Sequence, residues 1–190
     1  MFYVKIWYVP GLEELVAGGK DIFEAALKFY FDEKYSVEYS VFTGVERYIP
    51  PDRRQVNAKD FILDPPVELN KKKPQVNIFL IERDLFLPGF NYVFAVTNPA
   101  LARIIISLFR LSRDYNLVNY VGEYKVKERL FKELMHELGH FIGLEHCDNL
   151  LCVMSFSKTL KDLDNKVPYP CETCLERISS ILNRIRSMDP

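Results

Sequence analysis

The chain lacks the long apolar runs and the charge excess that mark several classes of protein. No stretch of its 190 residues stays apolar over the roughly eighteen positions that a membrane-spanning helix needs. Lysine and arginine number 25 against 26 aspartates and glutamates, so neither nucleic acid nor an anionic membrane is expected as a partner. The N-terminus alternates like a strand and lacks the basic segment, apolar stretch and cleavage site of a signal peptide. We therefore expect a cytoplasmic protein.

The remaining composition is that of a compact globular chain. Hydrophobic residues make up 48% of the sequence and aromatic residues 14%, which is enough for a substantial core. The length suits one domain, and no internal repeat, low-complexity tract or linker divides the sequence. We expect a single domain of residues 1–190 and a monomer.

Apolar periodicity predicts an α+β fold. Alternating or continuous apolar runs predict strands at residues 2–9, 34–42, 76–82, 91–97 and 103–111. Helical spacing predicts helices at residues 21–31, 56–63, 125–141 and 175–188. The strands precede the 125–141 helix and helical structure follows it. We expect one mixed, twisted sheet packed with this helix and with the C-terminal helix.

Histidine is scarce, and all three copies lie within eleven residues. They are His136, His140 and His146, in the pattern H-E-x-x-H-x-x-G-x-x-H. Residues four apart lie on one face of a helix, so His136 and His140 can bind one metal ion. Gly143 can adopt a positive φ, end the helix and turn the chain, which returns His146 as a third ligand. Three histidines leave one position for water, as in a catalytic zinc site.

Glu137 follows the first histidine and can reach a water molecule on the metal. Zinc lowers the pKa of such a water from about 16 towards 7. Glu137 could then accept the proton as hydroxide attacks a carbonyl, and return it to the leaving amine. The alternatives are a solvated helix residue and three structural histidines, neither of which explains the shared spacing. The pattern predicts a zinc hydrolase with Glu137 as general base.

Cysteine is equally sparse and equally concentrated. All four copies lie downstream of the histidines, as the pairs Cys147 and Cys152 (C-x4-C) and Cys171 and Cys174 (C-x-x-C). Four thiolates in two such pairs suit a closed, tetrahedral, structural zinc site, and a reducing compartment disfavours disulfides. Two disulfides remain the alternative. Because Cys147 directly follows His146, we expect two zinc ions per chain that lie near each other.

These motifs resemble those of the archaemetzincins, a branch of the metzincin clan of zinc peptidases. The resemblance rests on the three-histidine pattern, the cysteine after the third histidine, Cys152-Val153-Met154 and the distant C-x-x-C pair. Residues 81–111 are similar to the family as well. The resemblance implies a metzincin-like domain that hydrolyses peptide substrates with zinc.

The resemblance also implies a role for Met154. In metzincins a methionine in a tight turn forms an apolar floor beneath the zinc ligands, although a methionine alone more often fills a gap in the core. Many metzincins place a tyrosine two residues later to stabilise the oxyanion. Here that position is Phe156, which has no hydroxyl group, and Tyr169 is a candidate substitute. The strand expected at 91–97 could border the cleft and pair with an extended substrate, or could be an ordinary sheet strand.

Two other functions stay open at the level of sequence. The same zinc water could cleave a non-peptide amide or ester. The chain could instead be a zinc-stabilised binding module without activity. The intact Glu137 argues against the binding module, and the missing hydroxyl at Phe156 argues slightly for it.

Overall fold

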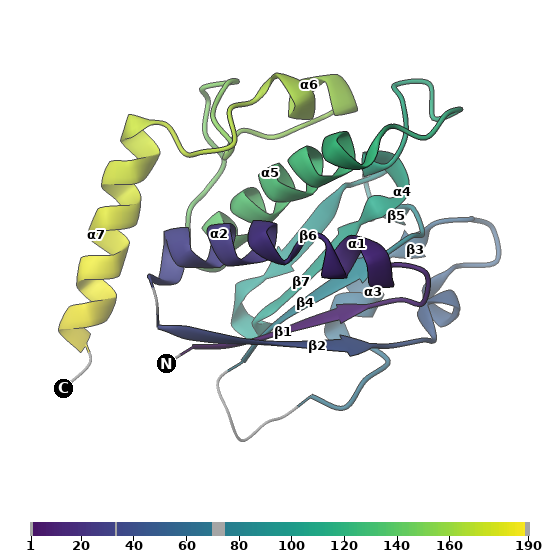
Figure 1. Cartoon of the computed structure of the whole chain (residues 1–190), viewed down its shortest axis with the longest axis horizontal. Coiled ribbons are helices and arrows are strands. Elements are labelled where there is room, and N and C mark those ends of the chain that lie inside the picture. Colours follow the sequence, from purple (N-terminus) through teal and green to yellow (C-terminus); the bar gives the residue numbers. More distant parts are fainter. Residues whose placement is uncertain (1, 33, 70–74, 189–190) are drawn as a thin grey trace.

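A five-stranded sheet lies at the centre of the computed structural model, which describes residues 2–32, 34–69 and 75–188 (Figure 1). Its strands are β1 (Phe2–Tyr8), β2 (Tyr35–Val41), β4 (Gln75–Ile81), β6 (Ala95–Asn98) and β7 (Arg103–Ser107). The order across the sheet is β2-β1-β4-β7-β6, in which β6 runs antiparallel to β7 and the other neighbours are parallel. Two short strands, β3 (Val56–Asn57) and β5 (Leu85–Phe86), pair separately. The predicted mixed sheet is confirmed.

Helices cover both faces of this sheet. They are α1 (Glu13–Ala17), α2 (Lys20–Phe31), α3 (Ala58–Leu63), α4 (Leu108–Leu111), α5 (Glu123–Phe141), α6 (Leu160–Asn165) and α7 (Glu172–Met188), with the 3-10 turns η1 (Val45–Tyr48) and η2 (Pro99–Leu101). Helices α2 and α5 pack together on one face, while α3 and η1 lie on the other (Figure 1). No helix in the described ranges combines the length and apolar character needed to cross a membrane.

Strand β4 shows how the sequence builds the two cores. Successive side chains of a strand point to opposite faces of the sheet. Val76, Ile78 and Leu80 therefore pack with α2 and α5, whereas Phe79 and Ile81 pack on the α3 side. All five are at most 2% exposed. The continuous apolar run predicted this central strand, because a strand covered on both faces has no polar side.

Two of the predicted strands have different bounds from those expected. The strand expected at 91–97 is β6, which begins only at Ala95. Before it, Val93 makes one isolated bridge to Leu85 of β5. The 103–111 strand ends at Ser107, and α4 follows. The Ser107 side chain accepts a hydrogen bond from the backbone N–H of Phe109 and so caps this short helix. This capping hydrogen bond favours a helix from Leu108 onwards, although the apolar run that predicted a strand continues.

Helix α5 positions the candidate site. Its core face consists of Leu130, Leu134 and Leu138, each at most 1% exposed, as the helical spacing predicted. The helix packs against α2 and also against β6, which is the edge strand of the sheet. The end of α5 that carries the histidine pair therefore lies beside an edge strand. Downstream, α7 is anchored to the same core by Cys174 and Ile178.

Candidate active site and metal centres

The C-terminal end of α5 reverses the chain in a way that explains the glycine of the histidine motif. The helix ends at Phe141, and Gly143 has φ of 106°, a conformation that strains residues with a Cβ atom. The N–H of Gly143 donates to the carbonyl of His140 over 3.0 Å, and that of Leu144 donates to the carbonyl of Gly139 over 2.9 Å. This pair of bonds is a Schellman motif. The predicted turn is present.

The three histidines come together beyond this turn. Their closest ring nitrogens all lie within 4.8 Å of one another, and the Nε2 atoms of His136 and His140 are 3.0 Å apart. The Nδ1 atom of His136 donates to the carbonyl of Val153, and that of His140 to the carbonyl of Leu144, each over 2.7 Å. Because a carbonyl can only accept, Nδ1 carries the proton and Nε2 keeps its lone pair for a metal. Tetrahedral zinc separates ligand nitrogens by about 3.3 Å, so the histidine cluster fits this ion.

Burial keeps these imidazoles neutral. It lowers the pKa of all three histidines, and for His136 the neighbouring His140 and the charge of Lys166 lower the pKa further. Metal ions bind the neutral form of histidine. The site is therefore set up electrostatically for a cation before any ligand arrives.

Glu137 follows His136 on α5, lines the same cleft as the three histidines and is 4% exposed. The hydroxyl of Thr97, on the edge strand β6, donates a hydrogen bond to its Oε2 atom over 2.5 Å. Burial and the neighbouring Glu133 raise the pKa of Glu137 to about 8, although the Thr97 hydrogen bond and the charge of Lys166 act in the opposite direction. One carboxylate oxygen of Glu137 is thus held in place, and the other is left to accept a proton.

A cleft of about 220 Å³ joins these groups, with the edge strand as one wall. Its lining includes the three histidines, Glu137 and the whole segment 92–97. Phe156 also lines this cleft, and its ring centroid lies 5.2 Å from that of His146. The predicted position of the 91–97 segment beside the cleft is therefore observed, although only part of it is a strand.

A larger depression of about 870 Å³ lies beyond the carboxyl ends of the parallel strands β1, β2, β4 and β7. Its lining mixes carboxylates with arginines, as in Glu82 and Arg83, and includes none of the histidines or cysteines. Volume alone does not identify a reaction centre. The smaller cleft has the metal-binding nitrogens and the buried carboxylate that catalysis needs.

Met154 packs against the helix turn between the first two histidines. A Cβ atom placed on Gly139 would lie 2.4 Å from the sulfur of Met154 and 2.9 Å from its methyl carbon. This contact explains why α5 has a glycine in its interior, which normally costs a helix about 1 kcal/mol. The carbonyl of Met154 also accepts the N–H of Cys147 over 2.9 Å. The turn at Met154 therefore contacts both the helix and the segment after His146.

Lys166 is a buried residue of this region that sequence reasoning missed. It is 4% exposed, and its ammonium donates to the carbonyls of Val153, over 3.4 Å, and of Ser155. The Val153 carbonyl is the same one that accepts from His136. Lys166 thus connects both sides of the Met154 turn to the histidine. A lone lysine in a polar stretch carries no signal of this role.

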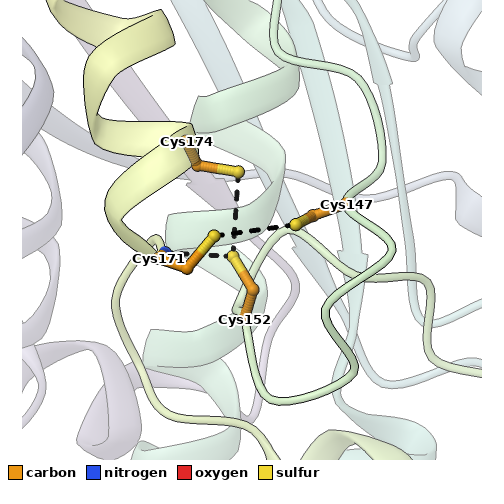
Figure 2. A group of neighbouring side chains, drawn as sticks. All are labelled: Cys147, Cys152, Cys171 and Cys174. Atoms are coloured by element: carbon orange, nitrogen blue, oxygen red, sulfur yellow. Dashed lines mark hydrogen bonds between the residues drawn. The ribbon is translucent and has the colours of Figure 1, made fainter.

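The four cysteine sulfurs converge on a common centre (Figure 2). The Sγ atoms of Cys147 and Cys171 are 3.7 Å apart, and those of Cys152 and Cys174 are 3.8 Å apart. A disulfide would place two sulfurs about 2.05 Å apart. Tetrahedral zinc with Zn–S bonds of about 2.3 Å places its sulfurs about 3.8 Å apart, so the thiols fit this ion.

The backbone around the cysteines favours ionisation at the start of α7. A backbone hydrogen bond from Cys174 is the main cause that lowers the pKa of Cys171 to about 7. Burial instead raises the pKa of Cys152 and of Cys174. The N–H of Cys171 also donates to the sulfur of Cys152 over 3.2 Å. Cys171 therefore supplies a thiolate for a metal more readily than Cys152 or Cys174.

The tyrosine considered as an oxyanion stabiliser lies elsewhere. The ring of Tyr169 packs against Phe29 and Phe131, with centroids 5.9 and 5.8 Å away, and it does not line the cleft. Tyr92 does line it, but its hydroxyl donates to the carbonyl of Lys158 over 2.5 Å. Neither tyrosine presents a free hydroxyl to the cleft, and Phe156 has none.

Comparison with known proteins agrees with this geometry. The family described as Peptidase family M54 matches residues 68–180. The archaemetzincin of Pyrococcus horikoshii is 34% identical over 161 residues, which cover 81% of this chain and 84% of the relative. That of Thermococcus kodakarensis is 32% identical over 179 residues, 92% of each chain.

Solved structures show the same architecture. The archaemetzincin of Methanopyrus kandleri superposes with a TM-score of 0.77 at 28% identity and covers 96% of both chains. The archaemetzincin of Archaeoglobus fulgidus gives 0.69 at 27% identity and covers 92% of this chain and 99% of that one. The resemblance inferred from the motifs and the predicted α+β fold are both confirmed.

Proposed function

Because the chain belongs to peptidase family M54 and is a zinc metallopeptidase, we propose that it hydrolyses peptide bonds in the cleft between α5 and β6, with Glu137 as the proton-transferring residue. The observation that carries this proposal is the position of Glu137. Its carboxylate lines the same cleft as the three histidines, and Thr97 holds one of its oxygens. Proton transfer by a carboxylate requires this combination of reach and fixed orientation.

We assign His136, His140 and His146 as the ligands of a catalytic zinc ion. The support is the pair of carbonyls that fix the Nδ1 protons and leave the Nε2 lone pairs free, together with the 3.0 Å spacing of the helical pair. When bound, this ion lowers the pKa of a water molecule and polarises the substrate carbonyl. Its three protein ligands leave a position open for chemistry.

We assign Cys147, Cys152, Cys171 and Cys174 to a second, structural zinc ion, which gives two zinc ions per chain. The support is the sulfur spacing of 3.7 and 3.8 Å and the presence of four free thiols. Four thiolates leave no position for a substrate. This site would hold the segment after α5 to the start of α7.

In the reaction, Glu137 accepts a proton from the attacking water and returns it to the leaving amine. Thr97 keeps the carboxylate oriented, since its hydroxyl donates to Oε2 and leaves Oε1 for the transfer. Lys166 and Val153 hold the ring of His136, because the Val153 carbonyl accepts from both. Met154 supports the same helix turn from below the histidine pair.

The edge strand β6 provides a surface for an extended substrate. It ends the sheet order within the described chain, and its residues Ala95, Val96 and Thr97 line the cleft. A free strand edge binds a peptide backbone through main-chain hydrogen bonds. This wall favours a peptide substrate over a small amide or ester, which would have no backbone to pair.

The predictions of a single domain of residues 1–190, a monomer and a cytoplasmic location remain proposals. The net charge of −1 continues to argue against nucleic acid and anionic membranes as partners. Size-exclusion chromatography with light scattering tests the monomer, for which a mass near 22.3 kDa is expected.

The proposed function is tested by replacing Glu137 with alanine. Peptide hydrolysis should fall by about 10²- to 10⁴-fold, because general acid–base catalysis is lost, while zinc content stays the same. Glu145→Ala is the matched control, since this exposed glutamate precedes His146 but does not line the cleft. Its kcat should stay near that of the wild type. Equal losses in both variants would contradict the role of Glu137.

A further inference from the structure

The cleft contains a second buried carboxyl group to which the proposed reaction gives no task. Glu133 lies one helical turn before Glu137 on α5, lines the same cleft and is 4% exposed. Within residues 2–32, 34–69 and 75–188, no hydrogen bond or ion pair reaches its carboxylate. Burial raises the pKa of Glu133 to about 7, and the charge of Lys166 opposes this rise. No protein donor in the described residues satisfies this carboxyl group.

The oxygens of Glu133 are not among the fully buried polar atoms without a partner in the described chain, so they are open to the cleft that this residue lines and can hydrogen-bond a ligand there. Ser157 provides a second and independent observation. Its hydroxyl is buried, lines the same cleft and has no hydrogen-bond partner in the described part of the chain. Two unpaired polar groups in one cavity indicate that the occupant brings its own hydrogen-bonding atoms.

Two polar side chains that line the cleft with Glu133, Lys166 and Thr97, make their hydrogen bonds to other groups. Lys166 directs its ammonium at the carbonyls of Val153 and Ser155. The Thr97 hydroxyl is bonded to Glu137. Only the ionised form of Glu133 is restricted to accepting hydrogen bonds, and a cationic donor is the partner that would favour this ionised form.

The residues at the mouth of the cleft indicate which kind of hydrogen-bond donor can enter it. Phe90 and Phe156 are 48% and 41% exposed, and their ring centroids lie 6.1 Å apart. Glu133, Glu137 and Lys166 line the same cleft and are each 4% exposed, so the cleft is apolar at its mouth and carries ionisable groups at its floor. A long side chain with an aliphatic stem and a cationic tip has the same order of polarity. The volume of about 220 Å³ suits one such side chain of a peptide whose backbone lies along β6.

We propose that Glu133 selects a lysine or arginine side chain of the substrate, whose cationic end donates hydrogen bonds to the buried carboxylate. This inference rests on the proposed function of the cleft, and it names the substrate class. Side chains one helical turn apart have Cβ atoms about 5–6 Å from each other. Glu133 is therefore close enough to Glu137 that the selected residue flanks the scissile bond.

The test compares fluorogenic peptides that differ only at the residues flanking the scissile bond, with lysine, arginine, norleucine, glutamine or glutamate at each. For wild-type enzyme, kcat/KM for lysine and arginine should exceed that for norleucine on the order of 10- to 100-fold, because a charge-assisted hydrogen bond is gained. Glu133→Gln keeps the shape and removes the charge, so this preference should disappear. Glu128→Gln is the matched control on the same helix, outside the cleft, and should keep the preference.

A binding measurement separates this inference from the proposed function. Zinc-loaded Glu137→Gln protein is titrated by calorimetry with the lysine peptide and the norleucine peptide, which it should not cleave. The lysine peptide should bind more tightly, and the double variant with Glu133→Gln should lose the difference. Equal affinities would overturn the role of Glu133, as would wild-type enzyme that cleaves the norleucine or glutamine peptide as fast as the lysine peptide.

The same measurements distinguish a failure of the inference about Glu133 from a failure of the proposed peptidase function. Wild-type enzyme that hydrolyses peptides without a basic preference overturns the inference and leaves the peptidase assignment intact. Wild-type enzyme that hydrolyses no peptide, yet binds the lysine peptide more tightly, overturns the reaction and supports the inference. The comparison of substrates with wild-type enzyme needs no variant. It can therefore overturn the inference even if Glu133→Gln fails to fold.

Discussion

The histidine cleft and the cysteine cluster share the dipeptide His146-Cys147 but differ in what surrounds them. The cleft contains two polar groups without partners in the described chain, Glu133 and Ser157, and a carboxylate held by a single hydroxyl. In the cluster, each sulfur lies against another sulfur, and the cysteines line neither cavity. A site that exchanges substrates keeps unsatisfied groups, whereas a site that holds the chain together does not.

Replacement of both Cys171 and Cys174 with alanine is the change with the largest expected effect. Metal affinity at a structural site contributes directly to the free energy of unfolding, so we expect a loss of at least several kcal/mol and a sharply lower Tm. Thermal unfolding followed by circular dichroism measures this. Glu137→Ala is the comparison and should unfold near the wild-type temperature. A thermally silent cysteine variant would remove the structural role from the cluster.

Gly139→Ala tests the packing between the histidine-bearing helix α5 and the turn at Met154. The added methyl group would lie 2.4 Å from the sulfur of Met154, and relief requires the turn or the helix to move. Forcing a methyl group into a packed site lowers the free energy of unfolding by about 1–3 kcal/mol. Urea unfolding should show this loss, and adding Met154→Ala should cost less in the Gly139→Ala background than in the wild type. Strictly additive losses would mean that the two residues do not interact.

A buried ion pair between α5 and α6 belongs to neither site and stabilises the fold itself. Arg129 and Asp164 have side chains only 2% and 7% exposed, and they join α5 to α6 over 2.8 Å. Burial raises the pKa of Asp164, but hydrogen bonds from Arg129, Tyr115 and Lys125, together with the charge of Arg129, outweigh this and bring it down to about 2. The folded pKa lies below the usual 3.8, so the stabilisation is complete above about pH 4 and is lost as pH falls towards 2.

The contacts of ionised Asp164 should therefore contribute about 2 kcal/mol in total to the free energy of unfolding at neutral pH. Urea unfolding of wild type and Asp164→Asn between pH 2 and pH 7 measures it. The difference between the two proteins should shrink as the pH falls below 4. A difference that is independent of pH would show that the carboxylate charge of Asp164 is not what stabilises the fold.

Thr97→Val has the smallest expected effect and acts only within the cleft. The variant keeps the shape of the side chain and removes the hydroxyl that orients Glu137. We expect kcat to fall by about fivefold to tenfold, the equivalent of roughly 1 kcal/mol for one hydrogen bond, with Tm nearly unchanged. Steady-state kinetics beside a melting curve checks both. Thr43→Val, a loop position outside the cleft, is the control and should leave kcat unaltered.

The parts of the site that the sequence predicted are those whose geometry is local. His136 and His140 lie on one helix, and Gly143 closes the turn that follows, so spacing alone places them together. The cysteines were predictable because metal-binding pairs have short, characteristic separations. The bounds of α5 and α7 differ from the predicted ones by two or three residues at the start and agree at the end.

The parts that the sequence did not predict depend on contacts between distant segments. Thr97 meets Glu137 across 40 positions of the chain, and Lys166 reaches the carbonyl of Val153 from a loop after α6. Glu133 appears in the sequence as an ordinary polar position of a helix, yet it is buried and lines the same cleft as β6. No local pattern records such tertiary contacts. The capping box of α6, from Thr159 to Asp162, was a readable signal for a helix not predicted there.

The zinc content of protein purified without added metal tests the contrast between an open and a closed site most directly. Elemental analysis should find two zinc ions per chain in the wild type. It should find one in a variant with His140 and His146 replaced by alanine, in which the cysteine cluster is intact. A wild type with a single zinc ion, or with Cys147, Cys152, Cys171 and Cys174 joined as disulfides under reducing conditions, would contradict the account.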